Sequence, residues 1–197
     1  MRNSAGIVWK KSLKTITNTR NMLPVYKNII LTGFMGAGKT TVGRILAQSC
    51  GFEFMDIDQI IVASQGKPIK DIFAEEGEEA FRNYETEALL SLQNVSEAVI
   101  ATGGGIILRS ENRQVLKQMG LVVYLRASFE TLLKRVSQSD QRPLADLSTG
   151  TEPLKGLLDS RVSLYEQADI VADTDDLDSR QVADYILDRL KKVAGSD

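Results

Sequence analysis

The most specific chemical signal in the sequence is a glycine-rich segment over residues 33–40 (GFMGAGKT). Spaced glycines followed by a lysine and a hydroxyl residue form the pattern of a phosphate-binding loop. The glycines let backbone N–H groups approach phosphate oxygens, Lys39 can reach the β- and γ-phosphates, and Thr40 offers its hydroxyl to Mg²⁺. A chance match is the alternative, but an apolar strand pattern precedes the loop and a helical pattern follows it. The segment therefore predicts binding of a nucleoside triphosphate.

Two carboxylates, Asp56 and Asp58, alternate with Ile57 at the end of the second expected strand. Ligands of open α/β sheets gather beyond the carboxyl ends of the strands, so both carboxylates can face the same crevice as the loop. One would hold the waters of Mg²⁺, and the other would accept a hydrogen bond from an attacking hydroxyl. An N-cap of the next helix explains Asp58 alone, but it does not explain the pair.

Arginines and glycines further along the chain are weaker signals, each with an ordinary alternative. Arg82 and Glu85 can touch on one helix, as in a surface salt bridge. The glycines at 103–105 end a strand and leave room for a ligand at the backbone, unless they form only a tight turn. Arg142 lies in a polar segment with the length of a lid, and Arg161 lies on the next helix. Either arginine can also be a solvated surface residue.

Apolar runs alternate with helical patterns along the rest of the chain. Strands are expected at 28–32, 52–55, 98–101, 121–125 and 169–172, and helices from 38 and at 59–64, 69–93 (interrupted near 76–77), 128–137, 152–167 and 179–193. Short apolar strands between helices indicate a mostly parallel sheet covered on both faces. We expect one three-layer α/β/α domain over residues 28–197 with a central five-stranded, mostly parallel sheet. Its substrate-binding segment would span about 57–90 and its lid about 138–151.

Taken together, these motifs resemble the shikimate kinase family over nearly all of residues 28–193. The resemblance rests on GFMGAGKTT, FMDID, residues 69–89, ATGGG, QRPLA and RVSLYEQAD, which follow in the family's order at fitting spacing. It implies a fold of the P-loop NTPase type, similar to nucleoside monophosphate kinases. It also implies transfer of the γ-phosphate of ATP to the 3-hydroxyl of shikimate in aromatic amino acid biosynthesis.

The resemblance further implies roles for individual residues. ATP would be bound by Gly36, Ala37, Gly38, Lys39, Thr40, Thr41, Arg135 and Arg142. Shikimate would be bound by Asp58, Arg82, Gly103, Gly104, Gly105 and Arg161, with Glu85 orienting Arg82. The catalytic residues would be Lys39, Asp58 and Arg142, where Asp58 is the candidate base and Arg142 meets the transferring phosphoryl group. Thr40 and, through water, Asp56 would hold Mg²⁺.

Two positions depart from the family's pattern. Val62 stands where members often carry glutamate, and we interpret it as a packing or surface change. Ser179 stands where members often carry proline near adenine, and backbone contacts to adenine can survive that change.

Composition limits the possible chemistry and partners. The chain has no histidine, so proton transfer falls to carboxylates or solvent. A catalytic triad that contains histidine and a metal site that contains histidine are both excluded. The single cysteine, Cys50, excludes an internal disulfide, suits a reducing cytoplasm and is expected to pack at a helix end. No run reaches the roughly 18–20 apolar residues of a membrane span. We expect a cytoplasmic monomer with no membrane partner.

The charge is unevenly distributed. Six of the 24 basic residues lie in residues 1–27, which hold no acid, so the remaining 18 basic residues face 26 acidic ones. An acidic body argues against nucleic acid as a partner. The basic stretch 1–27 is expected to be a mobile extension, with a targeting sequence as the alternative.

Two other functions remain open at this point. A gluconate or nucleoside monophosphate kinase would explain the phosphate loop and the lid, but not Asp56, Asp58, Arg82, the glycine run and Arg161 as one set. A non-catalytic nucleotide-binding module should have lost an acceptor-side or lid residue, and none is missing.

Overall fold

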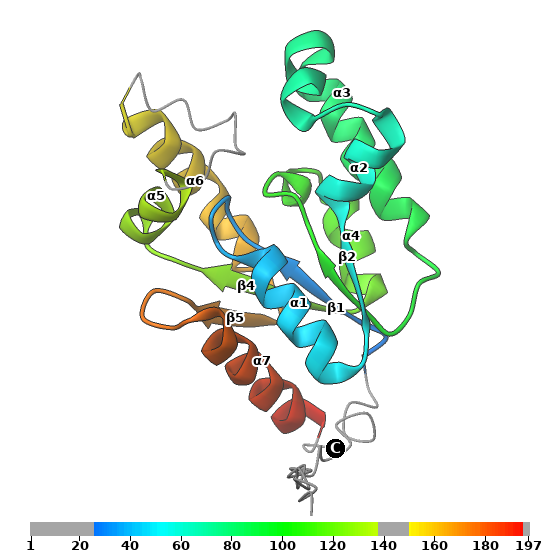
Figure 1. Cartoon of the computed structure of the whole chain (residues 1–197), viewed down its shortest axis with the longest axis vertical. Helices are drawn as coiled ribbons and strands as arrows, with labels where there is room; N and C mark the ends of the chain where they lie inside the picture. The colour runs from blue at the N-terminus through cyan, green and yellow to red at the C-terminus, as the bar shows by residue number, and fades with distance from the viewer. Residues whose placement is uncertain (1–25, 138–149, 195–197) are drawn as a thin grey trace, which may run out of the picture.

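A parallel β-sheet lies at the centre of the computed structural model, which describes residues 26–137 and 150–194 (Figure 1). Its strands are β1 (Asn28–Thr32), β2 (Glu53–Asp56), β3 (Ala98–Ala101), β4 (Leu121–Arg126) and β5 (Ile170–Asp173). They are ordered β2-β3-β1-β4-β5, and every neighbouring pair is parallel. The central strands β1 and β3 are buried along their whole length, as their apolar sequences require when helices cover both faces. The expected five-stranded sheet is confirmed, and all its described strands are parallel.

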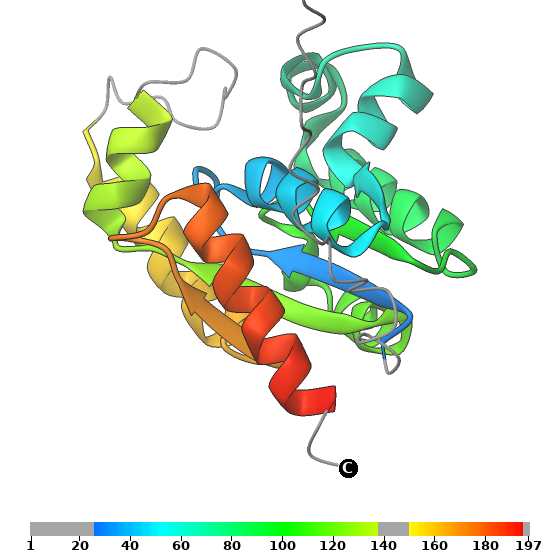
Figure 2. The same cartoon turned by 60° about the horizontal axis from the view of Figure 1, so that its bottom comes forward.

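Helices cover the sheet on both sides. They are α1 (Lys39–Cys50), α2 (Ile57–Gln65), α3 (Ile69–Ser91), α4 (Ser110–Met119), α5 (Phe129–Ser137), α6 (Glu152–Tyr165) and α7 (Ser179–Ala194), with a short 3₁₀ helix η2 (Ile106–Leu108). Figure 2 shows α1 and α7 side by side on one face of the sheet, where they contact each other, with α4 and α6 on the opposite face. The three-layer α/β/α architecture is therefore confirmed.

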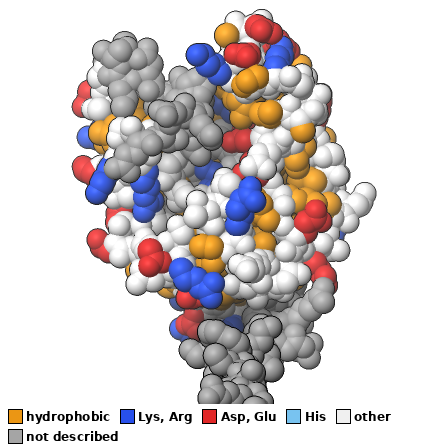
Figure 3. Space-filling model, in the orientation of Figure 1, with side chains coloured by type: hydrophobic (Ala, Val, Ile, Leu, Met, Phe, Trp, Pro, Cys, Tyr) orange, Lys and Arg blue, Asp and Glu red, His pale blue; other side chains and the backbone are white. Residues whose placement is uncertain are grey.

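The functional end of the molecule is built by segments that extend beyond the carboxyl ends of the strands. The pair α2 and α3 rises on one side of this end, and α5 with the start of α6 rises on the other (Figure 1). Hydrophobic side chains gather on the α2–α3 side in Figure 3. The helix α3 bends at Gly77, whose φ of 83° and ψ of 176° are not helical, as the interruption expected near 76–77 predicted.

The sequence-based expectation missed α4. Its sequence SENRQVLKQM is mostly polar, and the residues it buries are Asn112, Leu116 and Met119. An apolar stripe with a polar member is a weak helical signal, because periodicity depends on apolar residues at successive turns. The ends of the other helices and strands lie within about two residues of the expected ones. The short helix η2 was not expected.

Cys50 ends α1 and is 2% exposed, which confirms its expected place as a small packed side chain. Burial raises the pKa of its thiol to about 11. The thiol therefore stays protonated at neutral pH.

A buried asparagine at the start of β1 holds three parts of the sheet together. Asn28 is fully buried, and its Nδ2 donates to Val95 O and Met119 O, both at 2.9 Å. Its Oδ1 accepts a hydrogen bond of 3.1 Å from Ala98 N. The side chain thus joins β1 to the segments that lead into β3 and β4, its two neighbours in the sheet.

Replacing Asn28 by alanine should destabilise the fold. The change leaves one buried and one partly buried carbonyl and a buried N–H without this partner, so we expect a loss of about 2–4 kcal/mol in the free energy of unfolding. Urea denaturation measures this, with the exposed Asn94→Ala variant as the control. Equal midpoints for the two variants would contradict the structural role of Asn28.

Candidate active site

The phosphate loop connects β1 to α1 at the carboxyl edge of the sheet. Gly36 and Gly38 adopt φ angles of 81° and 92°, which L-residues with a side chain rarely adopt. Because α1 begins at Lys39, its first N–H groups and the positive end of its dipole point toward the loop. This is the local structure that an anion-binding loop requires.

Lys39 lies folded over this loop. The side chain is buried at 7% exposure, and Nζ donates hydrogen bonds to Gly33 O at 2.7 Å and Phe34 O at 3.0 Å. Carbonyl oxygens therefore hold the ammonium group at the point where the loop turns into the helix. A phosphate bound by the loop would meet a cation already in position.

A short hydrogen-bond chain links α1 to the end of β2. Thr40 Oγ1 donates to Asp56 Oδ2 at 2.8 Å. The other oxygen, Asp56 Oδ1, accepts from Asp58 N at 3.1 Å and Gln59 N at 3.4 Å and so caps α2. The sequence-based alternative named Asp58 as this N-cap, and it was wrong because α2 begins at Ile57, two residues earlier than expected. Asp58 lies in the first turn, where its side chain is not used for capping.

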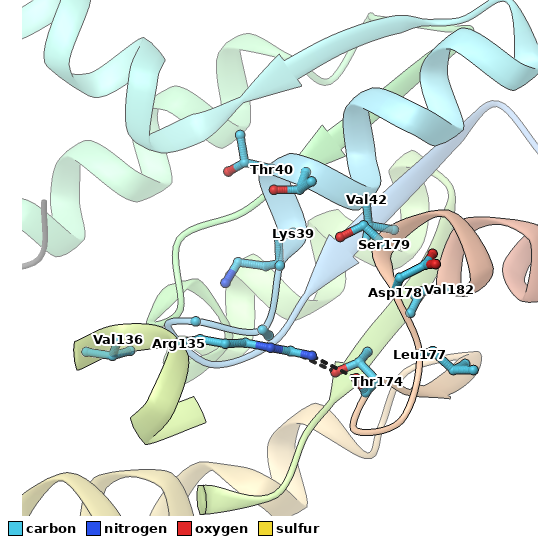
Figure 4. A pocket seen from close by; sticks show the side chains of 14 residues that line it. Lys39, Thr40, Val42, Arg135, Val136, Thr174, Leu177, Asp178, Ser179 and Val182 are labelled. Carbon is cyan, nitrogen blue, oxygen red and sulfur yellow. Dashed lines mark hydrogen bonds between the residues drawn. The ribbon is translucent and has the colours of Figure 1, made fainter. Parts of the chain in front are cut away.

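One cavity lies along the phosphate loop and α1. Its volume is about 450 Å³, and it is lined by Gly36, Ala37, Gly38, Lys39, Thr40, Thr41, Val42, Arg135, Val136, Thr174, Leu177, Asp178, Ser179 and Val182. Figure 4 shows Arg135 extended across the cavity wall to Thr174. Its Nη1 donates to Thr174 Oγ1 at 3.1 Å, and Nη2 donates to Thr174 O at 2.8 Å. All described residues expected to bind ATP lie in this cavity.

A second cavity lies between α3 and the glycine run. Its volume is about 560 Å³, and it is lined by Met35, Lys39, Thr40, Asp56, Asp58, Gln59, Val62, Ala63, Ile69, Phe73, Phe81, Arg82, Glu85, Gly103, Gly104, Gly105 and Arg161. All described residues expected on the substrate side line it. Lys39 and Thr40 line both cavities, so the two sites meet at the start of α1.

Arg82 and Glu85 form a buried ion pair in the second cavity. Arg82 is 7% exposed and Glu85 is 1% exposed, so the surface salt bridge considered from the sequence is wrong. Arg82 Nη1 donates to Glu85 Oε2 at 2.5 Å, and Nη2 donates to Glu78 Oε1 at 2.7 Å. Burial would lower the pKa of Arg82, but the carboxylates of Glu85 and Glu78 outweigh burial and leave it raised.

Glu85 is a buried carboxyl group of the site with a perturbed pKa. Burial raises its pKa to about 7, against the opposing effect of Arg82. The charge of Asp58 raises it further, and that of Arg161 lowers it. Among the described residues, Glu85 Oε1 has no hydrogen-bond partner. This oxygen is buried and lies close to the backbone of Gly103.

The glycine run lets charged side chains lie directly against the backbone. A Cβ at Gly105 would lie 2.1 Å from Arg82 Nη1, and a Cβ at Gly103 would lie 2.4 Å from Glu85 Oε1. Side chains at these positions would displace the ion pair, because no real Cβ contact is that short. The run does contain a turn, but its glycines also make room for the arginine and the carboxylate.

Arg161 points into the second cavity from α6. It is 6% exposed, its Nη1 donates to Gly104 O at 3.4 Å, and its guanidinium lies 6.0 Å from the ring centre of Phe34. Its Nε is buried and has no hydrogen-bond partner among the described residues. The cavity-facing orientation is therefore observed, and the surface alternative is wrong.

The sequence reasoning did not single out Tyr165, which supports the glycine run from α6. Its side chain is 1% exposed, its hydroxyl donates to Gly104 O at 2.5 Å, and its ring stacks on Tyr124 with centres 4.9 Å apart. Burial raises the pKa of the Tyr165 hydroxyl, which therefore remains a neutral donor. Its spacing of four residues from Arg161 was the available signal, since such pairs share a helix face.

Some expected features fall outside the described residues. These are Arg142, nearly all of the lid at about 138–151, and nearly all of the extension 1–27. Val62, the first departure from the family's pattern, is 37% exposed and lines the second cavity. Ser179, the second, lines the first cavity at the beginning of α7.

Within residues 26–137 and 150–194, no group of three or more histidine, cysteine or acidic side chains is arranged to hold a metal ion. Over the same residues, no helix is both long enough and apolar enough to cross a membrane.

The sequence and the fold are similar to those of known kinases. Residues 35–191 match the family model for shikimate kinase. A shikimate kinase from a Marinomonas species is 46% identical over 168 residues, which cover 84% of this chain and 92% of the relative. One from Thermodesulfovibrio yellowstonii is 41% identical over 168 residues, with coverage of 85% and 97%.

Solved structures agree with the sequence relatives. The shikimate kinase from Acinetobacter baumannii in complex with shikimate superposes with a TM-score of 0.83 at 40% identity, covering 88% of this chain and 98% of that one. A gluconokinase from Sinorhizobium meliloti has a TM-score of 0.54 at 19% identity, with coverage of 85% and 93%, and shares the fold alone.

The parallel sheet, the phosphate loop and the adjoining acceptor cavity define a small-molecule kinase of the P-loop class. The chain belongs to the shikimate kinase family. It is therefore a phosphotransferase with ATP as co-substrate and an alcohol group as acceptor, and the non-catalytic alternative is set aside.

The raised pKa of Glu85 predicts a pH-dependent stability. Between the ordinary value of 4.5 and the folded value of about 7, the folded chain binds the proton more tightly than the unfolded chain. The free energy of unfolding should therefore fall as pH rises through this interval. In the Glu85→Gln variant this decrease should shrink by about 1–3 kcal/mol between pH 5 and 8.

Urea denaturation at a series of pH values measures this effect. The control is Glu87→Gln, which changes an exposed carboxylate on the same helix and should keep the wild-type slope. If the free energy of unfolding changes with pH equally in wild type and in Glu85→Gln, the raised pKa of Glu85 is contradicted.

Proposed function

We propose that the chain transfers the γ-phosphate of ATP to the 3-hydroxyl of shikimate, giving shikimate 3-phosphate and ADP. The observation that carries this proposal is the meeting of two cavities at Lys39 and Thr40. One contains the phosphate loop, and the other contains a carboxylate, Asp58, together with the buried arginines Arg82 and Arg161. A triphosphate and a hydroxylated acid bound in these cavities would have their reacting groups side by side.

The first cavity supports ATP binding. The loop residues Gly36, Ala37 and Gly38 would surround the phosphates with N–H groups, followed by the N-terminal amides of α1 at Thr40 and Thr41. Arg135, tied to Thr174, forms the opposite wall, where the flat guanidinium would pack on adenine. Ser179 lies at the same end of the cavity.

Two buried arginines favour an acidic acceptor. Glu85 forms an ion pair with Arg82, whereas Arg161 donates to the carbonyl of Gly104 and forms no salt bridge with another described residue. Burying a cation in this way is costly unless an anion joins it. A carboxylate between the two guanidinium groups would supply that charge, so this pair is the proposed clamp for the shikimate carboxylate.

Asp58 is the proposed group that holds the reacting hydroxyl. It lies in the first turn of α2 and lines the same cavity as Lys39, which would face the transferring phosphate. A Cβ at Gly103 would lie 2.8 Å from Asp58 Oδ1, so the glycine backbone and the carboxylate are adjacent and can both contact ring hydroxyls. As a base, Asp58 would accept the proton of the 3-hydroxyl.

The absence of histidine from the sequence is compatible with this chemistry. Phosphoryl transfer depends mainly on positioning and on neutralising the charge of the phosphoryl oxygens, so a strong base is not required. Lys39 would supply charge from the loop. Arg142, whose role is proposed from the Arg-Pro-Leu motif alone, would supply charge from the lid.

The chain also offers suitable groups for Mg²⁺. The hydroxyl of Thr40 and the carboxylate of Asp56 lie 2.8 Å apart, and hard oxygen donors of this kind suit the ion. Thr40 would bind the ion directly and Asp56 through water. Mg²⁺ would supply positive charge to the β- and γ-phosphate oxygens. The proposal includes a cytoplasmic monomer without a membrane partner, and the acidic body disfavours nucleic acid as a partner.

An acceptor screen tests the proposed function. We expect ADP release, measured with coupling enzymes, in the presence of ATP, Mg²⁺ and shikimate. Quinate, gluconate and nucleoside monophosphates should give at least about tenfold lower kcat/KM, because each loses or misplaces a group that the buried arginines and Asp58 would bind. Release of ADP with gluconate or a nucleotide but not with shikimate would overturn the assignment.

Replacing Asp58 by asparagine separates catalysis from nucleotide binding. The amide keeps the shape but cannot accept the proton, so we expect kcat to fall by about 10²- to 10⁴-fold. The dissociation constant for ATP should change less than about twofold, since Asp58 does not line the first cavity. The exposed Asp159→Asn variant on α6 is the matched control. An equal loss of ATP affinity and turnover would refute the role of Asp58.

A further inference from the structure

An arginine outside both cavities braces the helix that carries Arg82. Arg109 precedes α4 and is partly buried, and its guanidinium donates four hydrogen bonds to α3. Nη1 donates to Arg82 O and to Thr86 Oγ1, both at 3.2 Å. Nη2 donates to Asn83 Oδ1 at 2.8 Å and to Glu79 Oε1 at 2.5 Å.

These acceptors lie on one face of α3. Glu79, Asn83 and Thr86 are spaced four and three residues apart, so they line up over two turns of the helix. The network closes on itself, because Thr86 Oγ1 also donates to Arg82 O at 3.1 Å. The backbone carbonyl of Arg82 is therefore at the centre of the contact.

The same short segment touches Arg82 at both of its ends. Four residues before Arg109, the backbone of Gly105 lies so close to the Arg82 guanidinium that a Cβ would be 2.1 Å from Nη1. Residues 105–109 thus hold the guanidinium at one end of the segment and the backbone of Arg82 at the other. Arg109 itself is not among the residues lining the second cavity.

The bend in α3 gives these contacts of Arg109 a role in positioning the helix. The helix bends at Gly77, and the part after the bend carries both Arg82 and Glu85. The helix α3 packs on α2, α4 and η2 (Figure 1). A small rotation of this part would move the Arg82 guanidinium by more than its backbone, because the side chain is long.

We propose that Arg109 is a positioning residue, which acts through Arg82 to hold the guanidinium where the acceptor carboxylate binds. The proposal rests on the role given to Arg82 under the proposed function. Forked recognition of a carboxylate depends on orientation as well as charge, so a displaced Arg82 binds it less tightly. Lysine cannot replace Arg109, since a point charge does not present a planar fork to several acceptors.

Calorimetric titration of the full-length protein with shikimate and with ATP tests the proposal. For Arg109→Met, which keeps an apolar stem of similar length, we expect shikimate affinity to fall about tenfold and ATP affinity to change less than about twofold. Steady-state kinetics should show the loss in KM for shikimate, with kcat within about threefold of wild type. Arg109→Lys should recover less than half of the lost binding free energy.

Arg126→Met is the matched control. Arg126 ends β4, is exposed, donates two hydrogen bonds to Asp173 and lines neither cavity. This variant removes a guanidinium with carboxylate contacts away from residues 105–109 and should keep wild-type affinity for shikimate. If Arg126→Met weakens shikimate binding as much as Arg109→Met does, the effect is general destabilisation and the proposal is overturned.

A double-mutant cycle separates this proposal from the assignment of Arg82. In an Arg82→Met background, Arg109→Met should weaken shikimate binding no further, because its effect passes through the missing guanidinium. A full tenfold loss in that background overturns the positioning role alone. If Arg82→Met itself leaves shikimate affinity unchanged, the proposed carboxylate clamp fails and the positioning role fails with it.

Discussion

The hydrogen bond of 2.8 Å between Thr40 Oγ1 and Asp56 Oδ2 joins the two halves of the site. Thr40 belongs to the helix that follows the phosphate loop, and Asp56 ends the strand that leads to the acceptor side. The second oxygen of Asp56 caps α2 and so orients the first turn, which carries Asp58. One carboxylate therefore connects the proposed Mg²⁺ ligand, the helix start and the proposed base. This connection is possible because β1, β3 and β2 are parallel neighbours whose carboxyl ends meet at one edge.

The acceptor side depends on a different constraint, the balance of buried charge. Arg82 and Glu85 neutralise each other, and the backbone at Gly103 and Gly105 gives them room because it carries no Cβ. Arg161 enters from the opposite side, donates to the carbonyl of Gly104 and forms no salt bridge with another described residue. An acidic acceptor would place its negative charge beside this guanidinium, which is the physical reason for proposing an acid rather than a neutral alcohol.

The phosphate loop and the alternation of strands and helices were predictable because both depend on local sequence. Glycine spacing determines where the backbone can turn, and apolar runs determine which segments are buried. The helix α4 was missed because Asn112 occupies a buried position in its stripe, where periodicity expects an apolar residue. The supporting contacts of Arg109 and Tyr165 could not be predicted from the local sequence either, since their partners lie 23 or more positions away.

The sequence by itself determined the class of chemistry. It specified a phosphate loop, paired carboxylates and arginines in an order that resembles a single kinase family, because residue types and their spacing are properties of the chain alone. Only the tertiary structure decided which of these charges are buried together. Packing against α4, η2 and the glycine run turned Arg82 and Glu85 from an ordinary helical pair into a buried one, and it turned Arg161 toward the cavity. Burial of a charge depends on what surrounds it from distant parts of the chain, and local sequence does not specify that environment.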